Sequence, residues 1–252
     1  MAGNNELNGK VAIVTGAGRN IGRAIALALA DGGASIVVNA RSNSAEADTV
    51  AREIESSGGK ALVHIGDVAD ATAVQAMAEA AVKQFGRIDI LVNNAALRRE
   101  KPFGEMSYAE WREILDVTLD GAFHCTKACL PALRKSGAGT VVSIGGLSAH
   151  TGSKNRAHVV TAKAGIVGFT RALAYDLAGD GITVNCVVPG LIGTPRPKEK
   201  PEPAHHLTHQ TITGARGRPE DVAATVRFLC GPGARYITGQ AIHTNGGAYL
   251  SS

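Results

Sequence analysis

The sequence is short of aromatic residues and of long apolar runs, and both shortages exclude classes of protein. Aromatic residues make up 4% of the 252 residues, and the net charge of +4 comes from scattered lysines and arginines. A nucleic-acid surface combines clustered basic residues with aromatic side chains for base stacking, so we expect no nucleic-acid partner. No apolar run reaches the roughly 20 residues that span a bilayer, so we expect no membrane span.

Cysteine is scarce as well, because four cysteines in a chain of this length do not make a disulfide framework. Cys125 and Cys129 stand four residues apart, but no second pair completes the spacing of a zinc site. We therefore expect buried free thiols and no metal. No signal-peptide pattern follows Met1, which predicts a cytoplasmic protein.

The chain is rich in glycine, with 31 residues, and in short apolar segments that alternate with amphipathic ones. Such alternation of strands and helices specifies a parallel sheet with right-handed crossovers and helices on both faces. We therefore expect a single α/β domain with a Rossmann-like, doubly wound, seven-stranded parallel sheet. The expected strands are 10–15, 35–40, 61–65, 88–92, 140–144, 183–188 and 240–243, and the expected helices are 21–31, 45–57, 71–85, 107–134, 158–178 and 220–230.

One segment of the second half lacks such a pattern. Residues 194–217 are rich in proline, histidine, lysine and glycine, and we expect them to be mobile. His205, His206 and His209 fall in this segment, but no acid or third ligand is well placed to complete a metal site.

The first expected strand and helix are joined by a glycine-rich turn, T-G-A-G-R-N-I-G, from Thr15 to Gly22. Glycines let the backbone approach a pyrophosphate, and a helix N-terminus offers unpaired N–H groups and a favourable dipole. A strand before the motif and a helix after it are the context that this interpretation requires. The predicted contact residues in the turn are Gly16, Gly18, Arg19, Asn20, Ile21 and Gly22.

The spacing of this turn resembles that of the short-chain dehydrogenase/reductase family. Further matching motifs extend the resemblance from Gly9 to Gly247: Asp67-Val68, Asn93-Asn94-Ala95-Ala96, Pro189-Gly190, Thr194, the segment 217–222, and Asn245-Gly246-Gly247. The subgroup typified by 3-oxoacyl-carrier-protein reductases is the most similar. Family members cover their substrate with a lid, which predicts that role for 194–217.

The resemblance also implies roles for residues at the ends of several strands. Asp67 would bind the adenine amino group, and Val68 would pack beside the ring. The remaining implied contacts are Asn93 and Ala95 beside the adenosine ribose, and Pro189, Gly190, Ile192 and Thr194 around the nicotinamide.

The end of the second strand predicts which dinucleotide binds. Sites for NAD usually place an acid there, which takes both ribose hydroxyls. This chain has Ala40, followed by Arg41 and Ser42, and Arg19 lies in the glycine turn. Two guanidinium groups and no carboxylate suit the additional 2′-phosphate, so we predict NADP(H).

The catalytic motif of the family is only partly present. In the family a tyrosine supplies the proton, a lysine four residues later lowers its pKa, a serine thirteen residues before the tyrosine holds the substrate oxygen, and an asparagine on the preceding helix anchors a water relay. Lys163 matches the lysine. Val159, Gly146 and Thr118 stand where the tyrosine, serine and asparagine are expected.

Three residues remain as candidates for the catalytic work. Lys163 can bind the ribose hydroxyls of the nicotinamide nucleoside, or donate a proton itself if burial lowers its pKa. His158 has a suitable ordinary pKa. However, it stands five residues before Lys163 and should point roughly 140° away from it, which favours a helix-entry or interface role. Ser148 is a third candidate if the loop brings it inward.

These observations leave three hypotheses for the function. The first is an NADP(H)-dependent oxidoreductase acting on a small C=O or C=N substrate, where an iminium would need no general acid. The second is a catalytically silent nucleotide-binding subunit or sensor, and the third is a non-redox lyase or isomerase on the same scaffold.

Assembly is a further implication of the resemblance, since relatives pair their two long helices into dimers and tetramers. The corresponding segments here are 107–134 and 158–178. The second carries the stripe Val160, Ala164, Val167, Arg171 and Tyr175, which suits either helix pairing or ordinary core packing.

Overall fold

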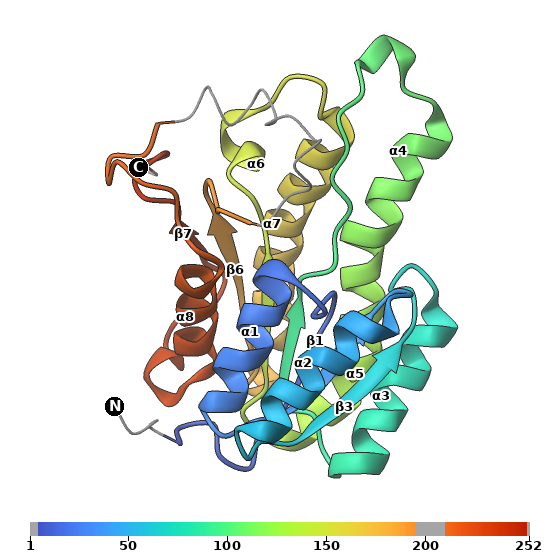
Figure 1. Cartoon of the computed structure of the whole chain (residues 1–252), viewed down its shortest axis with the longest axis vertical. Helices are drawn as coiled ribbons and strands as arrows, with labels where there is room; N and C mark the ends of the chain where they lie inside the picture. Colours follow the sequence, from blue (N-terminus) through green and yellow to red (C-terminus); the bar gives the residue numbers. More distant parts are fainter. Residues whose placement is uncertain (1–4, 195–209, 251–252) are drawn as a thin grey trace.

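Seven strands form one parallel sheet at the centre of the computed structural model, which describes residues 5–194 and 210–250 (Figure 1). The strand order is β3-β2-β1-β4-β5-β6-β7, as expected for a doubly wound sheet. The strands are β1 (Val11–Val14), β2 (Ser35–Ala40), β3 (Ala61–Ile65), β4 (Ile90–Asn93), β5 (Thr140–Ile144), β6 (Thr183–Pro189) and β7 (Ala241–Thr244). β2 and β3 lie on one side of β1, whereas β4 and the later strands lie on the other side. Ligands of such sheets bind at this switch point between β1 and β4.

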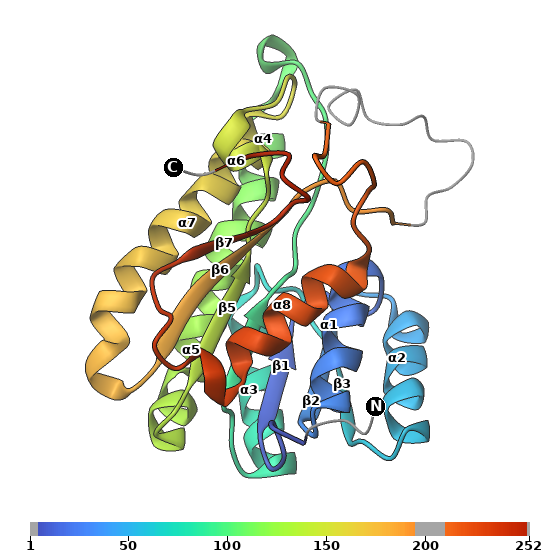
Figure 2. The ribbon, with the colours of Figure 1, turned by 90° about the vertical axis from the view of Figure 1, so that its left-hand side faces the viewer.

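Helices cover both faces of the sheet (Figure 2). Apolar residues of α1 (Asn20–Asp31), α2 (Ser44–Ser56) and α8 (Pro219–Cys230) form one core with the sheet. Residues of α3 (Ala71–Phe85), α5 (Gly121–Ser136) and α7 (Ala157–Leu177) form a second core on the opposite face. The five inner strands, β2, β1, β4, β5 and β6, are buried between these two layers, which explains why their sequences are mostly apolar without alternation, whereas the edge strands β3 and β7 are half-buried. No helix in the described ranges is long and apolar enough to cross a membrane.

Side-chain caps fix where several helices begin. Asn43 accepts a hydrogen bond from Glu46 N at the start of α2, and Asp70 accepts one from Thr72 N at the start of α3. Ser107 forms a reciprocal capping box with Glu110 at the start of α4 (Tyr108–Leu115). These caps satisfy N–H groups that the helices themselves leave unpaired.

The helix expected over 107–134 differs from the structure in one respect. It is interrupted by a π-helical turn, η2 (Asp116–Asp120), which separates α4 from α5. Gly121 opens α5 where a Cβ would lie 2.7 Å from a methyl carbon of Val68, so this residue lets the helix approach the sheet edge. A short helix, α6 (Ser148–Thr151), is also present and was not expected.

A buried carboxylate joins β1 to the segment before β4. The Asp89 side chain is 1% exposed and accepts hydrogen bonds from Val11 N at 2.9 Å and from the Arg87 guanidinium at 2.8 and 2.6 Å. Lys10 adds a longer contact of 3.4 Å. This network holds the amino ends of two adjacent strands together.

Candidate active site

The glycine turn between β1 and α1 has the close packing that its glycines permit. Gly16 has a φ of +62°, in the left-handed region that side chains disfavour. A Cβ on Gly22 would overlap the Gly16 carbonyl oxygen and lie 2.6 Å from Asn94 Nδ2. Both positions therefore require glycine, and the backbone of the turn stays open to a ligand.

Two asparagines that were not predicted as site residues hold this turn in place. Gly16 N donates to Asn39 Oδ1 at 3.3 Å, and the Asn39 amide donates to Gly66 O at 3.0 Å. Asn94 Nδ2 donates to Thr15 O at 2.8 Å and to Gly16 O at 3.0 Å. The position of Asn94 in the Asn-Asn-Ala-Ala motif was the available signal, but its side-chain partners depend on the fold.

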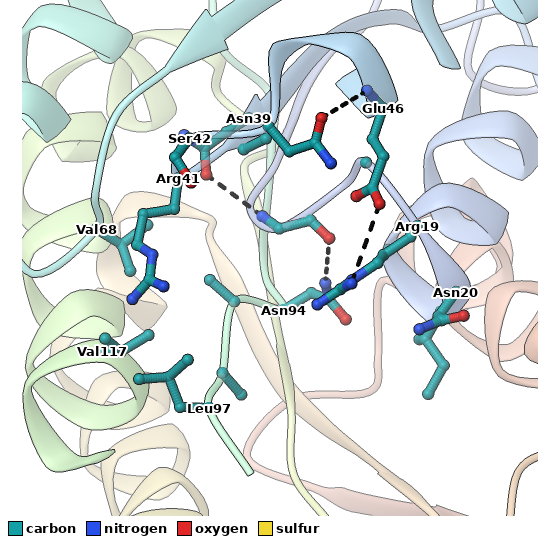
Figure 3. Close-up of a pocket in the computed structure, with 18 of the residues that line it drawn as sticks. Arg19, Asn20, Asn39, Arg41, Ser42, Glu46, Val68, Asn94, Leu97 and Val117 are labelled. Atoms are coloured by element: carbon teal, nitrogen blue, oxygen red, sulfur yellow. Dashed lines mark hydrogen bonds and ion pairs between the residues drawn. The ribbon is translucent and has the colours of Figure 1, made fainter. Parts of the chain in front are cut away.

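A cavity of about 470 Å³ opens beside the turn, at the switch point of the sheet (Figure 3). Its volume is in the range of small-molecule and cofactor sites. The N-terminus of α1 has no side-chain cap, because Arg19 occupies the N-cap position without capping. A bare glycine turn and an uncapped helix end fit the diphosphate of a dinucleotide.

Many of the predicted cofactor residues line this cavity. They are Gly16, Gly18, Arg19, Asn20, Ile21, Gly22, Arg41, Ser42, Asp67, Val68, Ala95 and Thr194. The cavity also has walls that sequence reasoning did not identify, among them Asn39, Glu46, Leu97, Arg98 and Val117.

The other predicted contacts lie outside this cavity. Asn93 directs its amide at Thr126 Oγ1, 3.3 Å away, and at Ser143 Oγ, 3.5 Å away, so its side chain supports β5. Gly190 packs on Asn245, whose Cα would be 2.7 Å from a Cβ at Gly190. Pro189 ends β6 beside the loop after β5, and Ile192 forms a bridge with Gly217. Their contacts with a cofactor remain predictions.

The end of β2 differs from the expectation on one point. Arg41 extends toward Val68 and Val117, as Figure 3 shows, while Arg19 lies 4.0 Å from the carboxylate of Glu46. β2 therefore ends at Ala40 with no acid, as expected, but a carboxylate from α2, Glu46, also lines this end of the cavity. Glu46 stands in the first turn of α2, three residues after its cap, and its place beside Arg19 depends on how α2 packs against the glycine turn, so no spacing along the chain signalled it.

Lys163 is buried at the carboxyl end of β5. The residue is 6% exposed, and its Nζ donates to Ile144 O at 2.5 Å. Burial, together with the positive charges of Arg98 and Arg156, lowers the pKa of Lys163 to about 7, and Cys186 opposes this shift. The amine therefore changes its protonation state near neutral pH.

Val159 and Gly146, which stand where the family has its tyrosine and serine, differ in how closely they are packed. A Cβ on Gly146 would lie 3.8 Å from Lys163 Cγ and meet nothing closer, so space remains open beside the lysine. Val159 is 3% exposed and packs in an apolar cluster with Ile114 and Leu115 of α4. A side chain larger than glycine therefore has space at position 146, whereas the surroundings of position 159 are filled.

Thr118, at the position of the expected asparagine, lies within η2. The residue is 4% exposed, and its hydroxyl oxygen has no hydrogen-bond partner in the described part of the chain. An oxygen buried in this way is a natural ligand for an ordered water molecule.

Within the part of the chain that the structure describes, no hydrogen bond joins His158 or Ser148 to Lys163. His158 is 1% exposed near the start of α7, and burial is the main cause that lowers its pKa. Ser148 is half-buried in the first turn of α6. Their catalytic roles remain predictions.

A second histidine, which was not predicted, anchors α6. The ring of His150 lies 4.6 Å from that of His243 on β7 and 5.4 Å from that of Tyr249, measured between centroids. Burial and the charge of Arg171 lower the pKa of His150. This packing attaches the loop that follows Gly146 to the last strand.

The predicted lid begins in the described residues but mostly lies outside them. Thr194 lines the cavity, whereas 195–209, with the three histidines, are not described. Within 5–194 and 210–250, no group of three or more histidine, cysteine, aspartate or glutamate side chains is arranged to hold a metal ion.

Comparison with known proteins identifies the family to which this chain belongs. The family model described as enoyl-(acyl carrier protein) reductase matches residues 16–249. The sequence is 41% identical to a 3-oxoacyl-[acyl-carrier-protein] reductase of Synechocystis sp. over 247 residues, which cover 97% of this chain and 98% of the relative. The chain belongs to the short-chain dehydrogenase/reductase family, whose enzymes are NAD(P)-dependent oxidoreductases.

Other relatives agree with this assignment. A 3-oxoacyl-[acyl-carrier-protein] reductase of Staphylococcus aureus is 38% identical over 242 residues, with 96% of this chain and 98% of the relative covered. A dehydrogenase/reductase from Sinorhizobium meliloti superposes with a TM-score of 0.91 at 33% identity, covering 98% of both chains. A 7α-hydroxysteroid dehydrogenase solved with NADH and 7-oxo glycochenodeoxycholic acid gives 0.90 at 35% identity, covering 97% of this chain and 96% of the other.

Proposed function

We propose that the protein is an NADP(H)-dependent oxidoreductase that transfers hydride to or from a small C=O or C=N substrate. The observation that carries this proposal is the cavity on the bare glycine turn at the N-terminus of α1. The dinucleotide supplies the hydride when it is bound. The residues of the chain bind and orient the dinucleotide, and one of them donates or accepts the proton.

The preference for NADP(H) rests on the two arginines at the adenosine end of the cavity. Arg41 and Ser42 follow β2, and Arg19 enters from the glycine turn. Guanidinium groups form charge-assisted hydrogen bonds with a phosphate. The exposed ion pair between Arg19 and Glu46 is weak enough to open when a 2′-phosphate competes for the arginine.

Lys163 is the residue to which we assign the proton. At neutral pH a pKa of about 7 allows Nζ to hold a proton in some molecules and release it in others, which suits a group that exchanges protons with a substrate. The amine can also bind the ribose hydroxyls of the nicotinamide nucleoside. An iminium substrate carries its own positive charge and accepts hydride without a general acid.

The test is to follow the loss of NADPH absorbance with panels of ketones, aldehydes and cyclic imines. We expect turnover by the wild-type protein and a loss of at least about 100-fold in kcat/KM for Lys163→Ala. Lys83→Ala, at an exposed position in the last turn of α3, is the matched control and should leave the rate unchanged.

The same assay separates the other hypotheses. Turnover of imines without ketones favours an iminium substrate. Tight NADPH binding with no turnover across the panels favours the silent sensor, because the serine and tyrosine of the family are absent. Conversion of a substrate without net change of NADPH favours the lyase or isomerase.

We also propose that the protein assembles into a homo-tetramer, or a dimer, through α4–α5 and α7. Support comes from the surface of α7, where Tyr175 is 88% exposed and Ala164 and Arg171 are exposed on the same face. Val167 of the expected stripe is instead buried in the core. Light scattering of the wild type and of Tyr175→Asp would test this proposal, since a monomeric wild type contradicts it.

A further inference from the structure

Three aromatic rings pack against one another near the carboxyl ends of the strands. They belong to His150 of α6, His243 of β7 and Tyr249 of the segment after β7. The ring centroids of the two histidines lie 4.6 Å apart. The Tyr249 centroid lies 5.4 Å from that of His150 and 5.2 Å from that of His243. These are distances of direct aromatic contact, so this ring cluster joins α6 to the last strand.

Asn245 fixes which nitrogen of His243 carries the proton. The orientation of its amide follows from two hydrogen bonds, because Nδ2 donates to Tyr249 O at 2.9 Å and Oδ1 accepts from Gly247 N at 2.9 Å. The second N–H of this amide faces His243 Nδ1, 3.5 Å away, so Nδ1 is an acceptor. A protonated histidine has an N–H on both nitrogens, and two donors would then face each other. The contact therefore requires a neutral His243.

The surroundings of the two histidines also oppose a positive charge. Burial is the main cause that lowers the pKa of both rings from the ordinary 6.5. The charge of Arg171 on α7 adds to this shift at His150, and the charge of His150 adds to it at His243. In the described ranges, His150 Nε2 is buried without a hydrogen-bond partner, so a proton on this nitrogen has no acceptor there.

The elements packed against this pair add no opposite charge. The Thr244 hydroxyl lies 3.0 Å from a threonine hydroxyl of α8. Successive side chains of a strand point to opposite faces, so His243 points away from α8, toward the face that α7 covers. On the neighbouring strand β6, Val188 is paired with His243. Of the residues that the structure describes, the charged and titratable groups that act on the pair or contact it are Arg171, Tyr249 and the two rings themselves.

The segment between β5 and α6 connects the ring cluster to Lys163. Ile144 O accepts the hydrogen bond from Lys163 Nζ, and a Cβ on Gly146 would lie 3.8 Å from Lys163 Cγ. Leu147 N then donates to Pro189 O at the end of β6, at 3.1 Å. The lysine, the end of β6 and α6 are thus joined by one continuous set of contacts.

We propose that His150 and His243 are positioning residues, which hold α6 on β7 while both rings are neutral and whose protonation in acid releases the segment 145–152. Protonation of His243 disrupts its contact with Asn245, and two positive rings in contact repel each other. The release needs no ligand, and only its effect on turnover rests on the proposed function. Histidine is the side chain whose ordinary pKa suits such a switch.

The direction of the effect follows from proton binding. In the released form the histidines have the ordinary pKa of 6.5, whereas in the attached form their pKa values are lower. The released form therefore binds protons more readily, and its population rises as the pH falls below 6.5. Above this pH the ring cluster contributes its full stability. Release moves Gly146 and Leu147 from their places beside Lys163 and Pro189, which should lower turnover.

The experiment measures amide hydrogen–deuterium exchange of the full chain without ligand, between about pH 7.5 and 5. The rates are corrected for the intrinsic effect of pH on exchange. We expect peptides that cover 145–152 to lose protection by about threefold or more in acid, while peptides that cover β1 keep theirs. The consumption of NADPH with a reducible ketone or imine is followed over the same range of pH.

Variants assign the loss of protection to the ring cluster. His150→Phe combined with His243→Phe keeps two aromatic rings that take up no proton, so 145–152 should stay protected in acid. Arg171→Gln, at an exposed position, removes a charge that opposes protonation and should move the loss to higher pH. His64→Gln is the matched control, because His64 is half-buried in β3 at the opposite edge of the sheet. If the double variant does not fold, as judged by circular dichroism, Arg171→Gln decides.

The outcomes separate this inference from the proposed function. The inference is overturned if the wild type keeps 145–152 protected down to about pH 5, or if β1 loses protection equally. It is also overturned if the folded double variant loses protection as the wild type does, or if Arg171→Gln leaves the loss at the same pH. Turnover with no change of exchange at 145–152 overturns it while the oxidoreductase proposal stands. The expected exchange in a protein that turns over no probe supports it and overturns the oxidoreductase proposal.

Discussion

Replacing Lys163 by methionine should change how the stability of the protein depends on pH. Methionine has a similar length and no charge, so it fills the same buried space without the cost of placing an ammonium group there. The pKa of Lys163 falls from its ordinary 10.5 to about 7 in the folded protein. This displacement corresponds to roughly 5 kcal/mol of unfavourable interaction with the protonated form.

The sign of the effect follows from proton binding. Between pH 7 and 10.5 the lysine of the unfolded chain holds a proton that the folded protein has released, so the wild type gains stability as the pH rises through this window. The contribution is complete above the unfolded pKa and is lost as the pH falls through about 7. Relative to Lys163→Met, the wild type should gain about 3 kcal/mol between pH 6.5 and 9.

Urea unfolding at several pH values measures this difference. Trp111 is the one tryptophan of the chain and packs beside the cluster that contains Val159, so its fluorescence reports unfolding near the site. Burial raises the pKa of the Cys186 thiol to about 11 and Lys163 opposes this shift, so the comparison is kept between pH 6.5 and 9, where the folded protein holds this thiol protonated. A difference that stays constant within about 0.5 kcal/mol would refute the assignment of a buried lysine that titrates near neutrality.

Three further results are expected. Glu46→Gln should tighten NADPH binding by about fivefold in isothermal titration and leave the affinity for NADH unchanged, because it removes a charge that competes with the 2′-phosphate for Arg19. Equal changes in the affinity for both cofactors would contradict this. Gly146→Ser combined with Val159→Tyr should raise kcat for a ketone by about 100-fold, because it restores the family's serine and tyrosine. The tyrosine should lower the free energy of unfolding by about 1–3 kcal/mol through overpacking. An unchanged kcat in a folded variant would show that Lys163 is not placed as in the family. Asp89→Ala should lower the free energy of unfolding by about 3–5 kcal/mol, since it leaves a buried backbone N–H and a guanidinium without their acceptor. A loss below about 1 kcal/mol in urea unfolding would show that this network is weak.

Local patterns were enough to predict most of the secondary structure. The strands Ser35–Ala40, Ala61–Ile65 and Thr140–Ile144 begin and end at the predicted residues, because short β-branched runs bounded by glycine or polar residues leave few alternatives. The parallel arrangement and the seven strands were confirmed as well. The π-helical turn was not predictable in this way, because it has the composition of an ordinary helix and depends on how α4 and α5 pack.

The glycine turn could be located from the sequence because a single short motif fixes its backbone, and its residues line the cavity in the structure. Their contacts with a cofactor remain predictions. Glu46 was missed because its position depends on how α2 returns to the turn, which spacing along the chain does not express. The charges around Lys163 were missed for the same reason, since Arg98 stands 65 residues before it and meets it only through the fold.

The hydrogen bond from Lys163 to the end of β5 has a consequence for how easily a proton can leave. A protonated lysine has three N–H donors and a neutral one keeps two, so Nζ can donate to Ile144 O in either state. The helix and the strand therefore need not shift when the charge changes. The amine can thus gain or lose a proton without a change of this contact, and the acceptor that holds the nitrogen in position is a backbone carbonyl that no side-chain substitution can remove.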